Sequence, residues 1–173
     1  MEETPTFDRE LKLCMAVGLE CAVVWSLAFF CNLGAFAYPL LAFLQFGLVI
    51  AALVHPAGRL VAYSRKVARL RGSRLILLTL LSFILCAVAT TFVQSVYFRY
   101  FDGGFFASQF LSAMDDLAPG NFGLQMDVLT ESLDVLTDPS TAPRALLATN
   151  LQFAFLGSLP AALMAVVRNR NRK

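Results

Sequence analysis

The chain has 173 residues, of which 58% are hydrophobic and 15% are charged, and its formal net charge is +2. An average soluble protein is about 45–50% apolar and about 25% charged, so the composition excludes an ordinary soluble domain and indicates a polytopic membrane protein. The single histidine, and four cysteines that form no CxxC pair, give no support to a zinc site or a disulfide framework. We expect no metal and no cofactor.

Four apolar stretches approach the length of about 20 residues that a helix needs to cross the hydrocarbon layer of a bilayer. We expect the spans to cover residues 13–34, 38–54, 75–98 and 146–167. The short connection between the first two spans predicts a tight hairpin, and the second span is expected to end at His55-Pro56. A competing interpretation is a signal peptide with a peptidase site at Ala35-Phe36-Ala37, but the acidic N-terminal region and the long apolar stretch disfavour it.

Glu20 is a charged residue in the middle of the first predicted span. A charge inside hydrocarbon costs about 2.5–3.5 kcal/mol on insertion scales, so this carboxyl should face the bundle, be protonated or have a partner. Counted from Lys12 at about 1.5 Å per residue, Glu20 lies roughly 12 Å deep. The residues at similar depth in the other spans are Gln45, Ser82 and Ser158. We predict an intramembrane polar centre made of these four residues, with Glu20 facing the bundle interior near Gln45.

Two roles for Glu20 remain open at this point. In the first, Glu20 forms hydrogen bonds across helices and serves only to pack the bundle. In the second, it relays protons or cations. A relay normally needs several ionisable groups in series, and the predicted spans place the nearest candidate, His55, at the inner edge of the membrane.

Two further features of the spans bear on helix packing. Gly18 and Ala22 form a small-xxx-small pair, which suits close contact between helices of one chain or of two chains. Pro160 lies inside the fourth predicted span, where it removes a backbone hydrogen bond and predicts a helix kink. The kink is either a packing feature or a gating hinge.

Basic residues are concentrated in three segments that an even number of spans places on one side of the membrane. These segments, the N-terminus, the loop after the second span and the C-terminal tail, hold twelve of the fourteen lysines and arginines. The positive-inside rule then predicts that both termini and this loop are cytoplasmic. The loop forms a cytoplasmic basic patch of Arg59, Arg65, Lys66, Arg69, Arg71 and Arg74.

The basic patch is expected to set the orientation and to attract anionic lipid. An acidic cytoplasmic protein is an alternative partner. Nucleic acid is not expected, because no base-reading element accompanies the charge.

The segment 99–145 is expected outside the cell, with two amphipathic helices whose apolar faces lie on the bilayer surface or cap the bundle. In "FFASQFLSAMDDL", apolar residues recur at i, i+4, i+8 and i+11 and predict one helical face. In "QMDVLTESLDVLTD", an apolar stripe lies beside an acidic stripe of Asp127, Glu131, Asp134 and Asp138. The acidic stripe is either a solvated helix face or a site for divalent cations or a partner, although EF-hand spacing is absent.

Two stretches in the second half of the chain carry a pattern shared with a known family. They are "FVQSVYFRYFDGGFFASQFL", which closes the third span, and "TNLQFAFLGSLPAALMAVVRNR", which forms the fourth. Tyr97, Phe98 and Asp102 match a YF-x-x-x-D signature, and Thr149 and Asn150 open the last span. In these positions the chain resembles the domain-of-unknown-function 4199 family of small four-span bacterial membrane proteins. The loop after the second span departs from the family pattern, because it lacks a glycine-rich stretch. The resemblance implies the architecture and no catalytic property.

The sequence therefore predicts an all-α fold: an integral membrane four-helix bundle, with two external amphipathic helices between spans 3 and 4, in one domain covering residues 1–173. The favoured function is that of a non-enzymatic accessory or interaction protein of the bacterial inner membrane, whose partner is another membrane protein or a second copy. The alternative is a small transporter or ion-conducting protein that uses Glu20. An enzyme is least expected, because no nucleophile–base pair, metal cluster or phosphate loop is visible.

Overall fold

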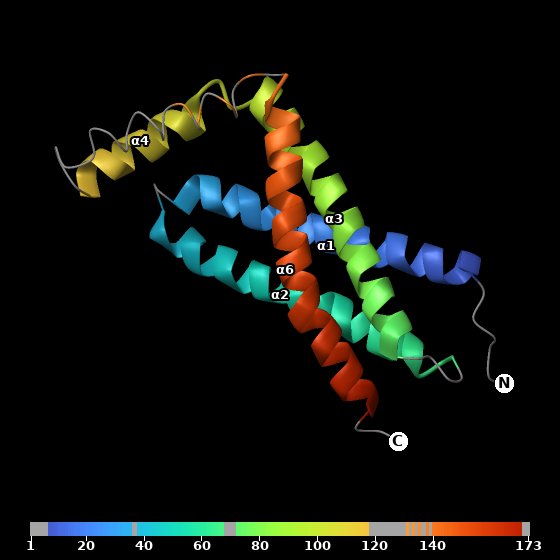
Figure 1. Cartoon of the computed structure of the whole chain (residues 1–173). Helices are drawn as coiled ribbons and strands as arrows, with labels where there is room; N and C mark the ends of the chain where they lie inside the picture. Colours follow the sequence, from blue (N-terminus) through green and yellow to red (C-terminus); the bar gives the residue numbers. More distant parts are fainter. Residues whose placement is uncertain are drawn as a thin grey trace.

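The computed structural model describes residues 7–35, 38–67, 72–117, 131, 133, 135, 138 and 140–170. The helices defined there are α1 (Phe7–Ala35), α2 (Pro39–Ser64), α3 (Gly72–Tyr100), α4 (Phe105–Leu117) and α6 (Ala142–Arg170), as Figure 1 shows. These described residues contain no β-strand, so the predicted all-α fold class is confirmed. α1, α2, α3 and α6 are each long and apolar enough to cross a membrane.

The four long helices form two antiparallel hairpins. α1 lies beside α2, and the predicted tight connection between them is confirmed, since the Tyr38 N–H donates to the Gly34 carbonyl at 2.9 Å. α3 lies beside α6, and the two hairpins cross, with α3 packed on α1 and α6 packed on α2 (Figure 1). The start of α1 and the end of α6 lie at one end of this bundle, which we call the terminal end, and α4 lies at the opposite end, which we call the α4 end.

Small side chains fill the centre of the bundle, whereas large ones cover its outside. Ala52 is fully buried, and Gly18 packs so closely on α3 that an added Cβ would lie 2.9 Å from the Leu85 Cβ. The predicted close contact at Gly18 is therefore a contact within the chain. In contrast, Leu40 and Phe43 are 78% and 77% exposed. This distribution is typical of helices that meet in lipid, where close backbone approach rather than burial from water holds them together.

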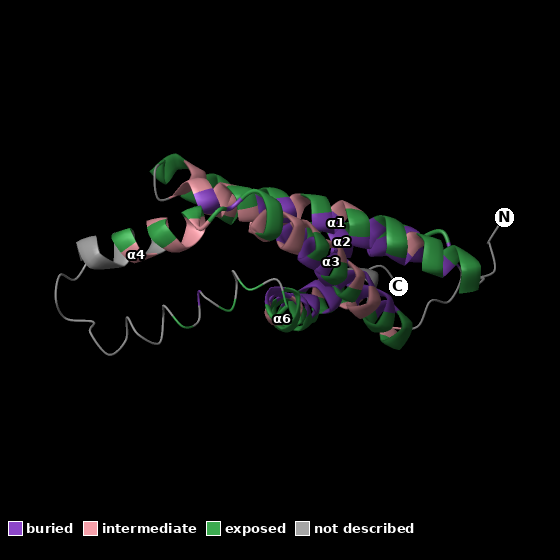
Figure 2. Ribbon diagram, turned by 90° about the horizontal axis from the view of Figure 1, so that it is seen from above, coloured by how far each residue is buried: buried purple, intermediate pink, exposed green. Residues whose placement is uncertain are grey.

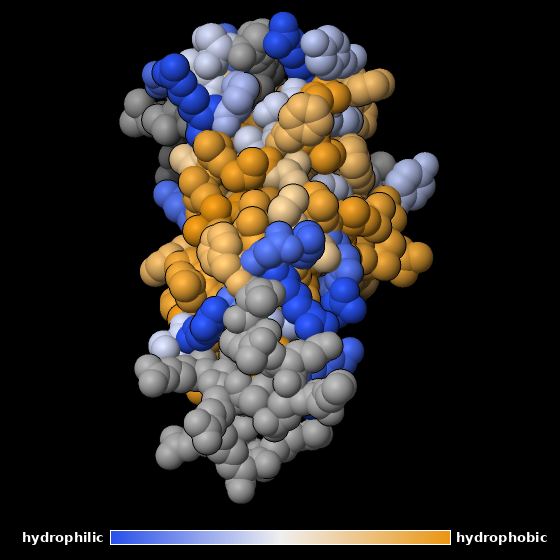
Figure 3. Space-filling view, turned by 90° about the vertical axis from the view of Figure 1, so that its right-hand side faces the viewer, coloured by the Kyte–Doolittle hydropathy of each residue, from blue (hydrophilic) through white to orange (hydrophobic). Residues whose placement is uncertain are grey.

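The surface carries the same pattern at a larger scale. Figure 2 shows buried residues on the faces where helices meet and exposed residues on the outward faces. Figure 3 shows a broad belt of apolar side chains between hydrophilic side chains at the two ends of the molecule. Together with the lengths of the four helices, this belt is consistent with a multi-pass membrane protein.

α2 continues well beyond the predicted end of the second span. That end was expected at Val54, but the helix runs through Pro56 to Ser64. Pro56 has no N–H with which to bond the Ala52 carbonyl. The thiol of Cys21 on α1 donates to this carbonyl instead, at 3.3 Å. A neighbouring helix therefore satisfies the group that the proline leaves free, and the helix is not broken.

α4 covers the same residues as the first predicted amphipathic helix. The Asp102 carboxylate caps its first turn, because it accepts hydrogen bonds from the backbone N–H groups of Gly104 at 3.1 Å and Phe106 at 3.0 Å. Gly103 and Gly104 have positive φ angles of 53° and 84°, which turn the chain from α3 into α4. The second predicted amphipathic helix, over residues 125–138, lies mostly outside the described residues.

The acidic stripe is described only in part. Asp127 and Asp134 lie outside the described residues, and Glu131 is exposed. The Asp138 carboxylate accepts hydrogen bonds from the N–H and the O–H of Ser140, both at 2.9 Å. These hydrogen bonds hold the pKa of Asp138 below its usual value. Asp138 is therefore engaged in the turn that precedes α6.

Candidate functional site

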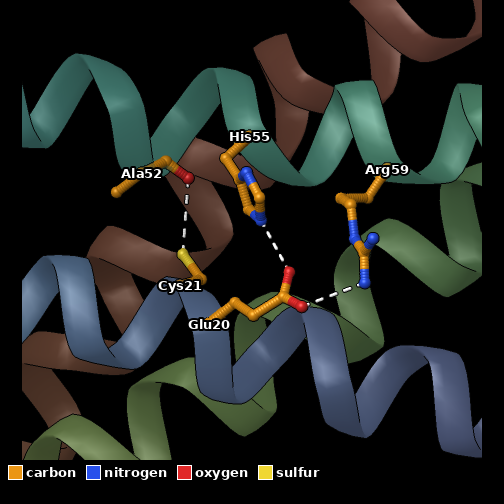
Figure 4. A network of polar contacts seen from close by, with 5 residues as sticks. All are labelled: Glu20, Cys21, Ala52, His55 and Arg59. Carbon is orange, nitrogen blue, oxygen red and sulfur yellow. Dashed lines mark hydrogen bonds and ion pairs between the residues drawn. The ribbon is translucent and has the colours of Figure 1, made fainter.

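Glu20 on α1 faces two basic side chains of α2. Its Oε2 atom lies 2.6 Å from Nε2 of His55, and Nη2 of Arg59 donates to its Oε1 atom at 2.9 Å (Figure 4). We call Glu20, His55 and Arg59 the charge cluster. The three side chains are 40%, 41% and 48% exposed, so the cluster lies at the surface of the α1–α2 hairpin. The prediction that Glu20 faces the bundle interior near Gln45 is therefore wrong.

The geometry of α2 explains why the charge cluster forms. His55 and Arg59 are four residues apart, so they lie one above the other on one face of the helix. The continuation of α2 through Pro56 is what places Arg59 on this face. Because the prediction ended the second span too early, it put His55 at the membrane edge and Arg59 in a loop, and it missed the cluster.

The charge cluster makes a carboxylate compatible with an apolar helix surface. Each oxygen of Glu20 has its own partner, and Arg59 provides a counter-charge. Removal of one member of such a pair costs more than removal of both, because the remaining charge then has no partner in surroundings that solvate it poorly. The cluster thus holds α1 and α2 together at this level.

The other members of the predicted polar centre do not join Glu20. The hydroxyls of Ser82 and Ser158 each donate to a carbonyl of their own helix, at 2.9 and 2.8 Å. Gln45 lines a cavity nearer the α4 end. The predicted four-residue centre is therefore wrong. Gln45 lies ten residues before His55 on α2, and so at another depth than Glu20, whereas Ser82 and Ser158 bond to their own helices.

α6 runs from Ala142 to Arg170 through Pro160. Three residues before this proline, an added Cβ at Gly157 would lie 2.8 Å from Cδ2 of Leu53 on α2. α6 therefore packs closely on α2 near the proline, which agrees with a packing role for this region. The kink itself stays a prediction.

The residues of the predicted basic patch are distributed among several environments. Arg59 belongs to the charge cluster. Nε and Nη2 of Arg74 both donate to one carboxylate oxygen of the buried Glu10, at 3.1 and 2.8 Å, and this ion pair ties the start of α3 to α1. Arg65 and Lys66 are exposed just after α2. The members of the patch outside the described part of the chain are Arg69 and Arg71.

A partly open cavity of about 380 Å³ lies among the four long helices, toward the α4 end, and Thr149 and Phe153 are exposed at its edge. We call it the amide-lined cavity, because four of the five polar residues that line it carry amide side chains. These polar residues, contributed by all four long helices, are Asn32, Gln45, Gln94, Thr149 and Asn150. Trp25, Phe29 and Phe153 supply aromatic walls, and the ring centroids of Trp25 and Phe153 lie 6.4 Å apart.

A hydrogen-bond network fixes one wall of the amide-lined cavity. Nδ2 of the buried Asn150 donates to Oγ1 of Thr91 at 2.9 Å and to Oε1 of Gln94 at 2.7 Å. The Thr91 hydroxyl in turn donates to the Ala87 carbonyl at 2.7 Å. Because the two N–H groups of Asn150 are engaged, its Oδ1 atom and the amide nitrogen of Gln94 are the groups that the described residues leave for a ligand.

The sequence held a signal for this network that the prediction did not use. Gln94 lies six residues before the end of α3, and Asn150 lies eight residues after the start of α6. In an antiparallel pair, these distances put the two amides at nearly the same level. Which faces they occupy follows only from the packing of α3 on α6.

Comparisons with protein-family models, with curated proteins and with solved structures find no match to this chain. The resemblance to the domain-of-unknown-function 4199 family therefore stays a prediction. The fold and the sites define the class: an all-helical chain with four helices able to span a membrane, a charge cluster on one hairpin and an amide-lined cavity between the hairpins.

We expect the charge cluster to behave as a coupled unit. Arg59→Gln alone should lower the free energy of unfolding more than the double change Glu20→Gln/Arg59→Gln, because the single change leaves a carboxylate without its counter-charge. The coupling energy should fall near the values for interhelical hydrogen bonds in membranes, about 0.6 kcal/mol on average and about 1.7 kcal/mol at most. A double-mutant cycle, measured by unfolding the purified protein in mixed micelles, gives this energy.

Arg65→Gln is the matched control for this cycle, since Arg65 is an exposed arginine just beyond the same helix. Arg65→Gln should add to Glu20→Gln without coupling. Strict additivity of Glu20→Gln and Arg59→Gln would contradict the cluster.

Proposed function

We propose that the chain is a non-enzymatic, multi-pass protein of the bacterial cytoplasmic membrane, and that it acts as an accessory or interaction protein for another envelope component. The observation that carries this proposal is the position of α4. Within the described residues, α4 packs extensively on none of the four long helices, and it extends away from the α3–α6 hairpin (Figures 1 and 2). A helix held away from its own bundle is available to a second protein.

The first turn of α4 is held in place by side-chain contacts, which supports a role of this helix in recognising a partner protein. The Asp102 carboxylate caps the helix. The ring centroids of Phe98 and Phe106 lie 5.8 Å apart, and Phe98 also packs edge-on against Phe29 of α1 at 5.8 Å. Aromatic contacts of this kind hold α4 in a defined direction, so a partner would meet a pre-oriented helix.

The proposed orientation places both termini in the cytoplasm and α4 outside. Arg65 and Lys66 are exposed at the terminal end, where α2 stops. Basic residues next to spans favour the cytoplasmic side. Each exposed Lys or Arg near the surface contributes about 1 kcal/mol of attraction to anionic lipid, so we propose anionic lipid as the ligand of the exposed part of the basic patch.

Cysteine labelling tests this orientation. A membrane-impermeant maleimide should label Ser140→Cys in cells whose outer membrane has been permeabilised, because Ser140 is exposed in the turn before α6. Lys66→Cys should be labelled only after the cytoplasmic membrane is disrupted. Both variants also carry Cys31→Ser, because Cys31 is half-buried, and the protein with this change alone, whose Cys14, Cys21 and Cys86 are buried, gives the background. The reverse labelling pattern would show that the proposed orientation is inverted.

A photo-crosslinking residue in α4 tests the interaction role. Placed at the exposed Ser108, it should form a discrete adduct with one protein, either a membrane protein or a second copy of this chain. The same residue at Leu163, which is 65% exposed on α6, serves as the control and should react with lipid. Lipid adducts alone at both positions would contradict the proposal and would make α4 a helix that rests on the bilayer surface.

A second candidate function is transport of protons or cations. The contact of 2.6 Å between Glu20 and His55 favours transport, because a relay needs a second ionisable group. The predicted spans had placed His55 at the membrane edge, too far from Glu20 to serve. The Arg59 guanidinium on the other oxygen of Glu20 opposes it, since a fixed counter-charge holds the carboxylate in place.

Flux measurements distinguish the two functions. We expect liposomes that contain the wild-type protein to conduct protons and monovalent cations no faster than liposomes with Glu20→Gln or without protein, because the charge of Glu20 is already compensated within the hairpin. A flux that is present in the wild type and lost in a folded Glu20→Gln variant would replace the interaction role with transport.

A further inference from the structure

We propose that the amide-lined cavity is a binding site for an uncharged, polyhydroxylated ring, that is, a sugar residue. The cavity volume of about 380 Å³ falls within the range of about 300–1,000 Å³ that is usual for small-molecule sites. The proposal does not depend on the role of α4, because different residues form the cavity.

The lining restricts the charge of the ligand. None of the described residues that line the cavity carries a formal charge. A carboxylate, a phosphate or an ammonium group would therefore lose water without gaining a counter-charge, and this loss is costly inside an apolar bundle. The site therefore favours an uncharged molecule.

The amides restrict the hydrogen-bonding groups of the ligand. An amide side chain offers both donors and acceptors, and a hydroxyl group also donates and accepts. Within the described residues, the side chains of Asn32 and Gln45 make no hydrogen bond to protein, and Asn150 and Gln94 keep one acceptor and one donor group for a ligand. Hydroxyls spaced around a ring match amides that converge from four helices.

The aromatic walls restrict the shape of the ligand. Trp25, Phe29 and Phe153 present large apolar surfaces beside the amides. A ligand that fills this cavity therefore has an apolar face as well as a polar rim. A sugar ring combines both, since its C–H groups form a flat face and its hydroxyls form the edge.

Two sources can supply such a ring: a free sugar on the α4 side, or the headgroup of a glycolipid that enters between the helices. The binding chemistry is the same in both cases. An experiment with one arm for each source therefore distinguishes them.

Trp25 is the only tryptophan in the chain and lines the cavity, so its fluorescence reports on the site directly. The full-length protein is placed in nanodiscs of phosphatidylglycerol. In one arm glucose is added to the solution, and in the other the nanodiscs also contain monoglucosyl diacylglycerol. Glucuronate, which keeps the pyranose ring of glucose but carries a carboxylate, is the matched negative probe.

We expect a saturable change of Trp25 emission in at least one arm and none with glucuronate. Gln45→Leu should weaken the response by about tenfold, the effect of one lost hydrogen bond. Gln152→Leu, the same change at an exposed position of α6 outside the lining, should leave it unaltered. A response to glucose assigns a free sugar, and a response only to the glycolipid assigns a headgroup.

The proposal is overturned by the absence of a response in both arms, by an equal response to glucuronate, or by an undiminished response in Gln45→Leu. The variant is expected to fold, because the Gln45 side chain makes no hydrogen bond to the described part of the protein. Far-ultraviolet circular dichroism checks this. Asn32→Leu, on α1, provides a second variant with the same expected loss.

Discussion

Close contact between small residues is the constraint on which the rest of this structure depends. In a bilayer, lipid tails are as apolar as leucine, so helices associate through packing at short range rather than through burial from water. Gly18 and Gly157 each lie where an added Cβ would come within 3 Å of a neighbouring helix, and Ala161 is completely buried. Where the helices pack this closely, there is little room for water between them. Polar groups between them therefore need partners on the neighbouring helix, as Asn150 finds on α3.

In the α1–α2 hairpin, one hydrogen-bond partner on the neighbouring helix determines how far α2 continues. The Cys21 thiol satisfies the Ala52 carbonyl that Pro56 leaves free, and α2 continues for two more turns. Those turns carry Arg59 to the level of Glu20, which is next to Cys21 in the chain. The charge cluster therefore depends on an adjacent hydrogen bond that itself involves no charge. Both interactions lie between the same two helices, so they stabilise the same contact.

The parts of the structure that could be predicted from the sequence are those set by local properties. Length and apolarity predicted four membrane-length helices, and a helical period predicted α4 at residues 105–117. The end of α2 could not be predicted in this way. The Ala52 carbonyl that Pro56 leaves unbonded accepts a hydrogen bond from Cys21, which belongs to another helix. Glu20 was recognised as unusual, but its partners depend on the rotation of α1 against α2. The amide-lined cavity depends on all four helices at once, and so no single stretch of sequence indicates it.

The positions of the charge cluster and the amide-lined cavity bear on whether ions could pass between them. Between them lies a packed layer of small residues, Cys21, Ala22, Ala52 and Cys86, against which Trp25 packs. The contact of Trp25 with Phe153 joins α1 to α6 at the cavity wall. A path for ions from the cavity to Glu20 would have to separate this layer, and the close contacts of the layer are the same ones that hold the helices together. This layer supports the proposals that the cavity holds a molecule rather than passing one and that the charge cluster fixes the hairpin rather than relaying a proton.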